Sequence, residues 1–160
     1  LAGRVEVPPG VEVGKGSMLL PLGFSPGLCV LLLRAVRPQR VRLLASPRSQ
    51  SLISTVRAAV SDLDLDLTWC IVQEGTSDLG GVVTELAGWL AEGPAPAYVD
   101  VTGGTKEMTL VTAAAGRCVS ARMLYVRHQD DERHNRPRFG TERIVECGWF
   151  YDPKPSISRL

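Results

Sequence analysis

The sequence predicts one α/β domain with a doubly wound, mainly parallel sheet of six strands, a Rossmann-like fold. Three observations lead to this prediction. Short apolar runs alternate with helical patterns along most of the 160 residues, which is typical of βαβ units. A chain of this length holds one sizeable core but not two full domains. The last two predicted strands have no helix between them, so they should pair antiparallel as a C-terminal hairpin at one edge.

The first strand and helix follow an irregular beginning. Residues 1–16 are rich in proline and glycine, which is typical of a lead-in or a linker. The continuous apolar run at 17–23 predicts a buried strand that tolerates a proline near one end. Pro26 suits the first turn of a helix, which should run to residue 36 and end before Pro38.

The same alternation continues in the middle of the chain. Residues 41–45 predict a second strand, and the polar turn 46–49 opens a helix that runs to about residue 60. Residues 62–67 alternate aspartate with leucine and lead into a third strand at 68–72. We interpret the aspartates as a solvated face rather than as a metal site, because alternation before a strand is the simpler explanation.

The second half supplies the remaining elements. A helix at 79–92 is ended by a Gly-Pro-Ala-Pro sequence. The further predictions are a fourth strand ending near 101, a helix to about 118, a fifth strand at 122–126, a polar loop at 128–140 and a sixth strand at 141–147. The domain is therefore expected at 17–147, and residues 148–160 are expected to form a C-terminal tail.

Composition excludes several classes of protein. A net charge of +1 argues against a protein that coats DNA through bulk charge, so we expect no direct DNA binding. No run approaches the roughly 20 apolar residues of a membrane span. The four cysteines are widely spaced and form no C-x-x-C pair, which favours reduced thiols in the cytoplasm over zinc ligands or disulfides.

The stretch 98–108 is the strongest functional signal. A short apolar strand runs into Thr102, the glycine pair Gly103-Gly104, Thr105 and Lys106, and then into a helix. Glycines permit close approach of a ligand to the backbone, and a helix N-terminus attracts anions. A lysine in the first helical turn opposes the helix dipole, and a bound anion would relieve that conflict. The alternative is a tight turn in which Thr105 caps the helix and Lys106 is merely solvated.

The expected strand order places a second loop of the chain beside this stretch. If the chain winds outward from its first strand and then returns, strand order reverses between the first and fourth strands, and ligands bind beyond their carboxyl ends. The loops at that point are 23–27 and 102–106. Neither contains the G-x-G-x-x-G or the G-x-x-x-x-G-K-[ST] pattern. A dinucleotide dehydrogenase and an NTPase are therefore disfavoured.

Residues 100–106, Asp-Val-Thr-Gly-Gly-Thr-Lys, resemble the ligand-binding motif of CRISPR-associated Rossmann fold (CARF) domains. The loop 23–26 and the helix after it resemble that family's other ligand loop, and the order of strands and helices agrees over roughly 17–147. The resemblance implies an antiviral sensor of a type III CRISPR system, a homodimer that binds a cyclic oligoadenylate across its interface. Cyclic tetra-adenylate is the favoured ligand.

The resemblance also implies which residues bind the ligand. They come from the loops after the first, second and fourth strands: Phe24, Ser25, Pro26, Ser46, Arg48, Thr102, Gly103, Gly104, Thr105 and Lys106. Glu74 and Thr76, after the third strand, are weaker candidates. No cofactor, metal ligand or catalytic residue is assigned. The output should lie in an effector segment upstream of Leu1, either a short membrane helix or a soluble catalytic domain. The chain is expected in the cytoplasm, and at the cytoplasmic face of a membrane if that segment is a membrane helix.

Two enzyme hypotheses remain open. A metal-independent ring nuclease would place a ribose 2′-hydroxyl in line with its phosphate, with Lys106 stabilising the developing charge and Ser25 or Thr105 orienting the sugar. The predicted pocket loops contain no histidine to act as a general base. A small-nucleotide or sugar-phosphate enzyme is the other hypothesis, because fold does not determine function. Arg-His pairs at 127–128 and 133–134 fall in one charged loop, which we interpret as solvated.

Overall fold

The computed structural model confirms the predicted α/β class. It describes residues 5–134, 136–138 and 140–147. The principal elements, in chain order, are β1 (Ser17–Leu22), α1 (Pro26–Val36), β2 (Arg40–Ala45), α2 (Ile53–Ala59), β3 (Asp66–Ile71), α3 (Leu79–Glu92), β4 (Ala97–Asp100), α4 (Lys106–Cys118), β5 (Arg122–Arg127) and β8 (Arg143–Glu146). The predicted tail, 148–160, lies outside the described residues.

The main sheet has the strand order β3-β2-β1-β4-β5-β8. All neighbours pair in parallel except β5 and β8, which are antiparallel. The chain winds from β1 outward to β3 and then returns to the other side of β1 as β4. This confirms the predicted reversal of strand order between the first and fourth strands, and the predicted antiparallel edge.

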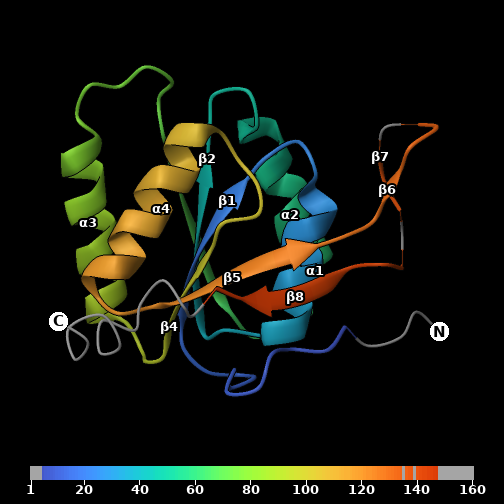
Figure 1. Cartoon of the computed structure of the whole chain (residues 1–160). Helices are drawn as coiled ribbons and strands as arrows, with labels where there is room; N and C mark the ends of the chain where they lie inside the picture. The colour runs from blue at the N-terminus through green and yellow to red at the C-terminus, as the bar shows by residue number, and fades with distance from the viewer. Residues whose placement is uncertain (1–4, 135, 139, 148–160) are drawn as a thin grey trace, which may run out of the picture.

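Helices α1 and α2 cover one face of the sheet, and α3 and α4 cover the other (Figure 1). The central strand β1 is buried along its whole length. Met18, Leu20 and Leu22 pack into the core beneath α1 and α2, whereas Leu19 packs into the core beneath α3 and α4. This assignment follows from the alternation of side chains along a strand, and it explains why β1 is apolar at nearly every position.

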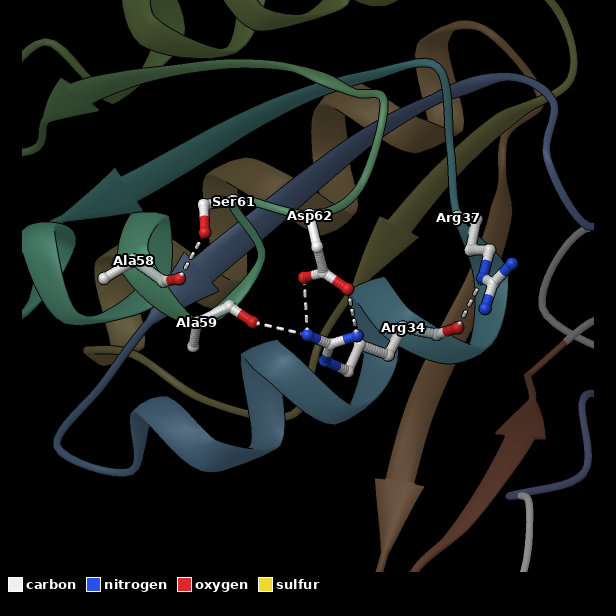
Figure 2. A network of polar contacts seen from close by, with 6 residues as sticks. All are labelled: Arg34, Arg37, Ala58, Ala59, Ser61 and Asp62. Atoms are coloured by element: carbon white, nitrogen blue, oxygen red, sulfur yellow. Dashed lines mark hydrogen bonds and ion pairs between the residues drawn. The ribbon is translucent and has the colours of Figure 1, made fainter.

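The junction between α1 and α2 is held by a polar network (Figure 2). The guanidinium of Arg34 donates to both carboxylate oxygens of Asp62, at 2.7 and 3.1 Å, and to the carbonyl oxygen of Ala59 at 2.8 Å. This pairing lowers the pKa of the exposed Asp62 carboxyl group. Asp62 is one of the alternating aspartates of the sequence, and it fixes the end of α2 as well as facing solvent.

Several element boundaries differ from the sequence prediction. The second helix is a 3₁₀ turn, Gln50–Leu52, followed by α2. Strand β3 begins at Asp66 rather than at 68, since the alternating segment already pairs with β2. The polar loop after β5 contains two short strands, β6 (Asp130–Asp131) and β7 (Arg136–Pro137), which pair with each other.

The segment before β1 lies against the domain. Val5, Val7 and Val11 pack on the core beneath α1 and α2. The backbone N–H of Glu12 donates to the hydroxyl of Tyr98 at 2.9 Å. Residues 5–16 form no helix or strand, but these contacts fix their course along the sheet. Within the described part of the chain, no helix combines the length and the apolar character needed to cross a membrane.

Candidate functional site

A pocket opens where β1 and β4 separate at their carboxyl ends. The two strands pair only over Ser17–Leu19 and Ala97–Val99, while β1 continues beside β2 as far as Leu22. Pro21 lies in the unpaired stretch and has no N–H to donate toward β4, so a proline is tolerated there in a central strand. The separation leaves a cavity of about 340 Å³ at the point where strand order reverses.

Two glycines let the loops after β1 and β4 come into contact. A Cβ atom added to Gly23 would lie 2.9 Å from the backbone nitrogen of Gly104. Gly104 has a φ of +92°, and a Cβ atom on it would lie 2.9 Å from Cβ of Pro21. A side chain at either position would push the loops apart, and at Gly104 it would also require a backbone conformation that L-residues avoid.

The second loop leads directly into α4. Thr105 caps the helix, because its hydroxyl accepts a hydrogen bond of 3.2 Å from the N–H of Met108. The Thr109 hydroxyl lies within hydrogen-bond distance of the carbonyl oxygens of Gly103 (3.3 Å) and Thr105 (3.1 Å). Lys106 is the first residue of α4 and is exposed. The positive end of the helix dipole therefore faces the glycine loop.

Asp100 and Thr102 form the polar floor of the pocket. The Thr102 hydroxyl donates to Oδ1 of Asp100 at 2.5 Å, and the Thr102 N–H donates to the same oxygen at 3.3 Å. The N–H of Val126 donates to the Thr102 hydroxyl at 2.8 Å. Because this hydroxyl has a single proton, which it gives to Asp100, it has none to donate to a ligand. Thr102 thus fastens the end of β4 to β5.

Burial changes the protonation of two groups that line the pocket. Asp100 is only 3% exposed, and burial raises the pKa of its carboxyl group from 3.8 to about 7, although the hydrogen bonds from Thr102 oppose the rise. Burial, together with the nearby Asp100 charge, raises the pKa of the Cys29 thiol to about 12. The Cys29 thiol therefore stays protonated near neutral pH and donates to the carbonyl oxygen of Pro21 at 3.5 Å, so it is no nucleophile.

The opposite wall comes from the loops after β2 and β3. The hydroxyls of Ser46 and Ser49 lie 3.2 Å apart, and each accepts a hydrogen bond from the other residue's N–H. Both serines are buried. Arg48 pairs with Glu74 at 3.6 Å across the two loops, and both side chains are well exposed. This wall combines a fixed hydroxyl pair with a solvated ion pair at its rim.

Most of the residues predicted from the sequence meet in this pocket. Those that line it are Phe24, Ser25, Ser46, Arg48, Thr102, Gly103, Gly104 and Thr105. Pro26 and Lys106 are not among the lining residues: Pro26 is the first residue of α1, and Lys106 lies just outside the pocket at the start of α4. Of the weaker candidates, Glu74 lines the pocket and Thr76 does not. Contact of any of these residues with a ligand stays a prediction.

Sequence reasoning did not select three buried polar residues that line the pocket: Cys29, Ser49 and Asp100. Asp100 precedes the glycine motif directly, and Ser49 stands three positions after Ser46, a spacing that suits reciprocal side-chain to backbone bonds. Those two signals were present in the sequence. In the part of the chain that the structure describes, no cluster of three or more histidine, cysteine or acidic residues is arranged to hold a metal ion.

Comparison with known proteins gives one curated relative and several similar structures. No protein-family model matches the sequence. The chain is 33% identical over 130 residues to the CRISPR system endoribonuclease Csm6 of Thermus thermophilus, an alignment that covers 77% of this chain and 27% of the relative. The chain thus spans about a quarter of the length of that relative.

Two solved structures share the fold. Csm6 of Enterococcus italicus, bound to cyclic hexa-2′-fluoro-hexa-dAMP, matches with a TM-score of 0.64 and 15% identity over 92% of this chain and 45% of that chain. Can2 of Sulfobacillus thermosulfidooxidans, in complex with cyclic tetra-adenylate, matches with a TM-score of 0.55 and 23% identity over 71% of this chain and 32% of that chain. At these identities the likeness concerns the fold alone.

Proposed function

Because the chain is a CRISPR-associated Rossmann fold (CARF) domain of a type III CRISPR effector, we propose that it senses a cyclic oligoadenylate, with cyclic tetra-adenylate as the favoured ring. One observation carries the proposal. The two loops that resemble the family's ligand loops, 23–25 and 102–105, line one pocket at the reversal of strand order. Two structures of the same fold hold rings of this class, cyclic tetra-adenylate in Can2 and a cyclic hexanucleotide in the Enterococcus italicus Csm6, which supports a cyclic oligonucleotide as the ligand.

The chemistry of the glycine loop suits a phosphodiester. Gly103 and Gly104 carry no side chains that would keep a ligand from their backbone. Lys106 stands at the positive end of the α4 dipole, where a cation is unfavourable by roughly 0.3–1 kcal/mol in the absence of an anion. A phosphate placed there accepts hydrogen bonds from backbone N–H groups and also neutralises this conflict.

A second copy of the chain completes the site in this proposal. A cavity of about 340 Å³ lies at the small end of the range for single small-molecule ligands, and a ring of four nucleotides is larger. Phe24 at the pocket mouth is 74% exposed, and Leu110, one turn along α4 from Lys106, is 61% exposed. A two-fold dimer across these side chains would bury them and would match the symmetry of the ring.

The proposal assigns 17–147 to the sensing domain, with 1–16 as a lead-in and 148–160 as a tail. We place the effector outside this chain, and the small share of the Csm6 relative that the alignment covers, 27%, supports this placement. The messenger reaches the domain in the cytoplasm. Binding transmits a signal if the ring has different affinities for two arrangements of the dimer.

Calorimetric titration of the chain with cyclic tri-, tetra- and hexa-adenylate tests the proposal, with linear tetra-adenylate as the control ligand. We expect cyclic tetra-adenylate to bind with at least micromolar affinity, one ring for every two chains, and the linear control to bind more weakly. Light scattering of the complex after size-exclusion chromatography should give the mass of two chains with one ring. Absence of heat from all three rings at micromolar concentrations would overturn the proposal.

A further inference from the structure

Asp100 is an acidic side chain in a pocket that we assign to a polyanion. It lines the cavity and is 3% exposed. A negative charge at this depth would repel a phosphodiester, and it would also be costly in itself, because a buried charge without a partner is unfavourable. An aspartate in such a position therefore needs either a cation beside it or a proton on it.

No cation lies against Asp100 among the described residues. From α1 it faces the Cys29 thiol, which stays protonated near neutral pH. Cys147, just after β8, is also affected by the Asp100 charge, and its pKa is likewise raised, mainly by burial. Arg48 at the rim is paired with Glu74, and Lys106 does not line the cavity. The groups that favour its ionised form are the Thr102 hydroxyl and the N–H groups of Thr102 and Val101.

The hydrogen bonds to Asp100 leave one of its carboxylate oxygens available for a proton. Both bonds from Thr102 end on Oδ1 of Asp100. A proton on the other oxygen, Oδ2, leaves these two bonds intact and turns that oxygen into a donor. The phosphate oxygens and adenine ring nitrogens of an oligoadenylate are acceptors, so a neutral Asp100 can donate a hydrogen bond to them, whereas an ionised Asp100 has no proton to donate and repels the phosphates.

We propose that the chain binds its anionic ligand only with Asp100 protonated, so that binding takes up one proton and Asp100 holds it at the floor of the pocket. This inference rests on the proposed function of the same site. Asp100 acts in two ways: it fixes Thr102 and the glycine loop through Oδ1, and its neutral carboxyl group admits the polyanion.

The proposal predicts how affinity depends on pH. With a pKa of about 7 in the free protein, roughly nine-tenths of Asp100 is neutral at pH 6 and about one-tenth at pH 8. Because one ring occupies the pockets of two chains, the binding-competent fraction of the dimer is the square of the neutral fraction, and the apparent dissociation constant of the ring should rise about a hundredfold between these pH values. Proton uptake should approach one per pocket at pH 8.

Calorimetry with cyclic tetra-adenylate at pH 6, 7 and 8, in two buffers of different ionisation enthalpy, measures both quantities on the wild-type chain. Asp100→Asn is the informative variant, since its amide keeps the Oδ1 acceptor and supplies a permanent donor in place of the protonated oxygen. It should bind at pH 8 as tightly as the wild type does at pH 6, without proton uptake. Asp64→Asn, at an exposed site outside the pocket, is the matched control and should keep the wild-type slope.

The outcomes separate this inference from the proposed function. If the wild type binds the ring with the same affinity at pH 6 and pH 8 and takes up no proton, the proposed function stands and the role of Asp100 is wrong. The same holds if Asp100→Asn keeps the wild-type slope. If the ring does not bind at any of the three pH values, the proposed function fails and the inference fails with it.

Discussion

The two walls of the pocket are built in different ways. The wall from β1 and β4 depends on close backbone approach: a Cβ atom on Gly23 would meet the backbone of Gly104, and one on Gly104 would meet the side chains of Pro21 and Met108. Thr102 ties this loop to β5. The wall from β2 and β3 is defined by side chains, the buried pair Ser46 and Ser49 and the solvated pair of Arg48 with Glu74. Substitutions in the first wall should therefore change the shape of the pocket and the stability of the chain. Substitutions at the rim of the second wall should change the electrostatic attraction of the ligand.

Substitution of Gly104 should give the largest effect. In Gly104→Ala the residue must hold a φ of +92° and place its Cβ atom 2.9 Å from that of Pro21. Backbone strain and overpacking each cost about 1–3 kcal/mol, so we expect a loss of roughly 3 kcal/mol in the free energy of unfolding and a loss of ring binding. Denaturant unfolding and calorimetry measure the two effects.

Gly103→Ala is the matched control for this variant. A Cβ atom on Gly103 would meet its nearest neighbour, the carbonyl oxygen of Pro21, at an ordinary 3.7 Å, and its φ lies outside the positive range that strains other residues. We expect its stability to stay within about 1 kcal/mol of the wild type. Equal destabilisation by the two alanines would show that backbone geometry does not define this wall.

The pH dependence of stability is the next largest effect. The folded-state pKa of Asp100, about 7, lies above its ordinary 3.8, so the folded chain binds this proton more tightly than the unfolded chain does. The resulting stabilisation is complete below about pH 4 and is lost as the pH rises to about 7. Relative to Asp100→Asn, the wild type should lose roughly 2–3 kcal/mol of unfolding free energy between pH 5 and pH 8. Parallel pH profiles for the two proteins would contradict the burial of an unpaired carboxyl group.

Thr102→Val should give a smaller effect that is confined to the first wall. The valine leaves the N–H of Val126 without its acceptor and removes one of the two hydrogen bonds to Oδ1 of Asp100, which costs about 1–3 kcal/mol. Thr102→Ser keeps the hydroxyl and should restore most of the loss. Amide exchange at Val126 provides a local measurement and should accelerate in the valine variant alone. Unchanged exchange there would show that Thr102 does not fasten β4 to β5.

Charge changes at the rim of the second wall should have the smallest effect on stability. Arg48 and Glu74 are exposed, and exposed ion pairs contribute at most about 1 kcal/mol. Arg48→Ala and Glu74→Gln should leave thermal unfolding nearly unchanged, but they should shift ring affinity a few-fold in opposite directions, weaker for the first and tighter for the second. Both shifts should shrink at high salt. Shifts of the same sign would contradict an electrostatic role for the rim.

The sequence was sufficient for the fold and for the loops of the first wall. Alternating apolar runs predicted the strands, and the Gly-Gly-Thr-Lys pattern after the fourth strand identified one loop of the pocket. Asp100 and Ser49 stand close to predicted residues in the sequence but were not selected, because their burial in one pocket depends on packing between segments about 50 positions apart. Lys106 was predicted for the site, but it is exposed and does not line the pocket, a placement that sequence spacing does not determine.

The central claim is that a cyclic oligoadenylate occupies the pocket between the β1 and β4 loops. The most direct measurement is the change in backbone amide resonances of the isotope-labelled chain when cyclic tetra-adenylate is added. We expect the largest changes at Gly23, Gly103 and Gly104, smaller ones at Ser49, and none at Asp64, which precedes the amino end of β3 and lies outside the pocket. No change on addition of the ring, or changes centred on the β6–β7 hairpin with the glycine loops unaffected, would contradict the claim.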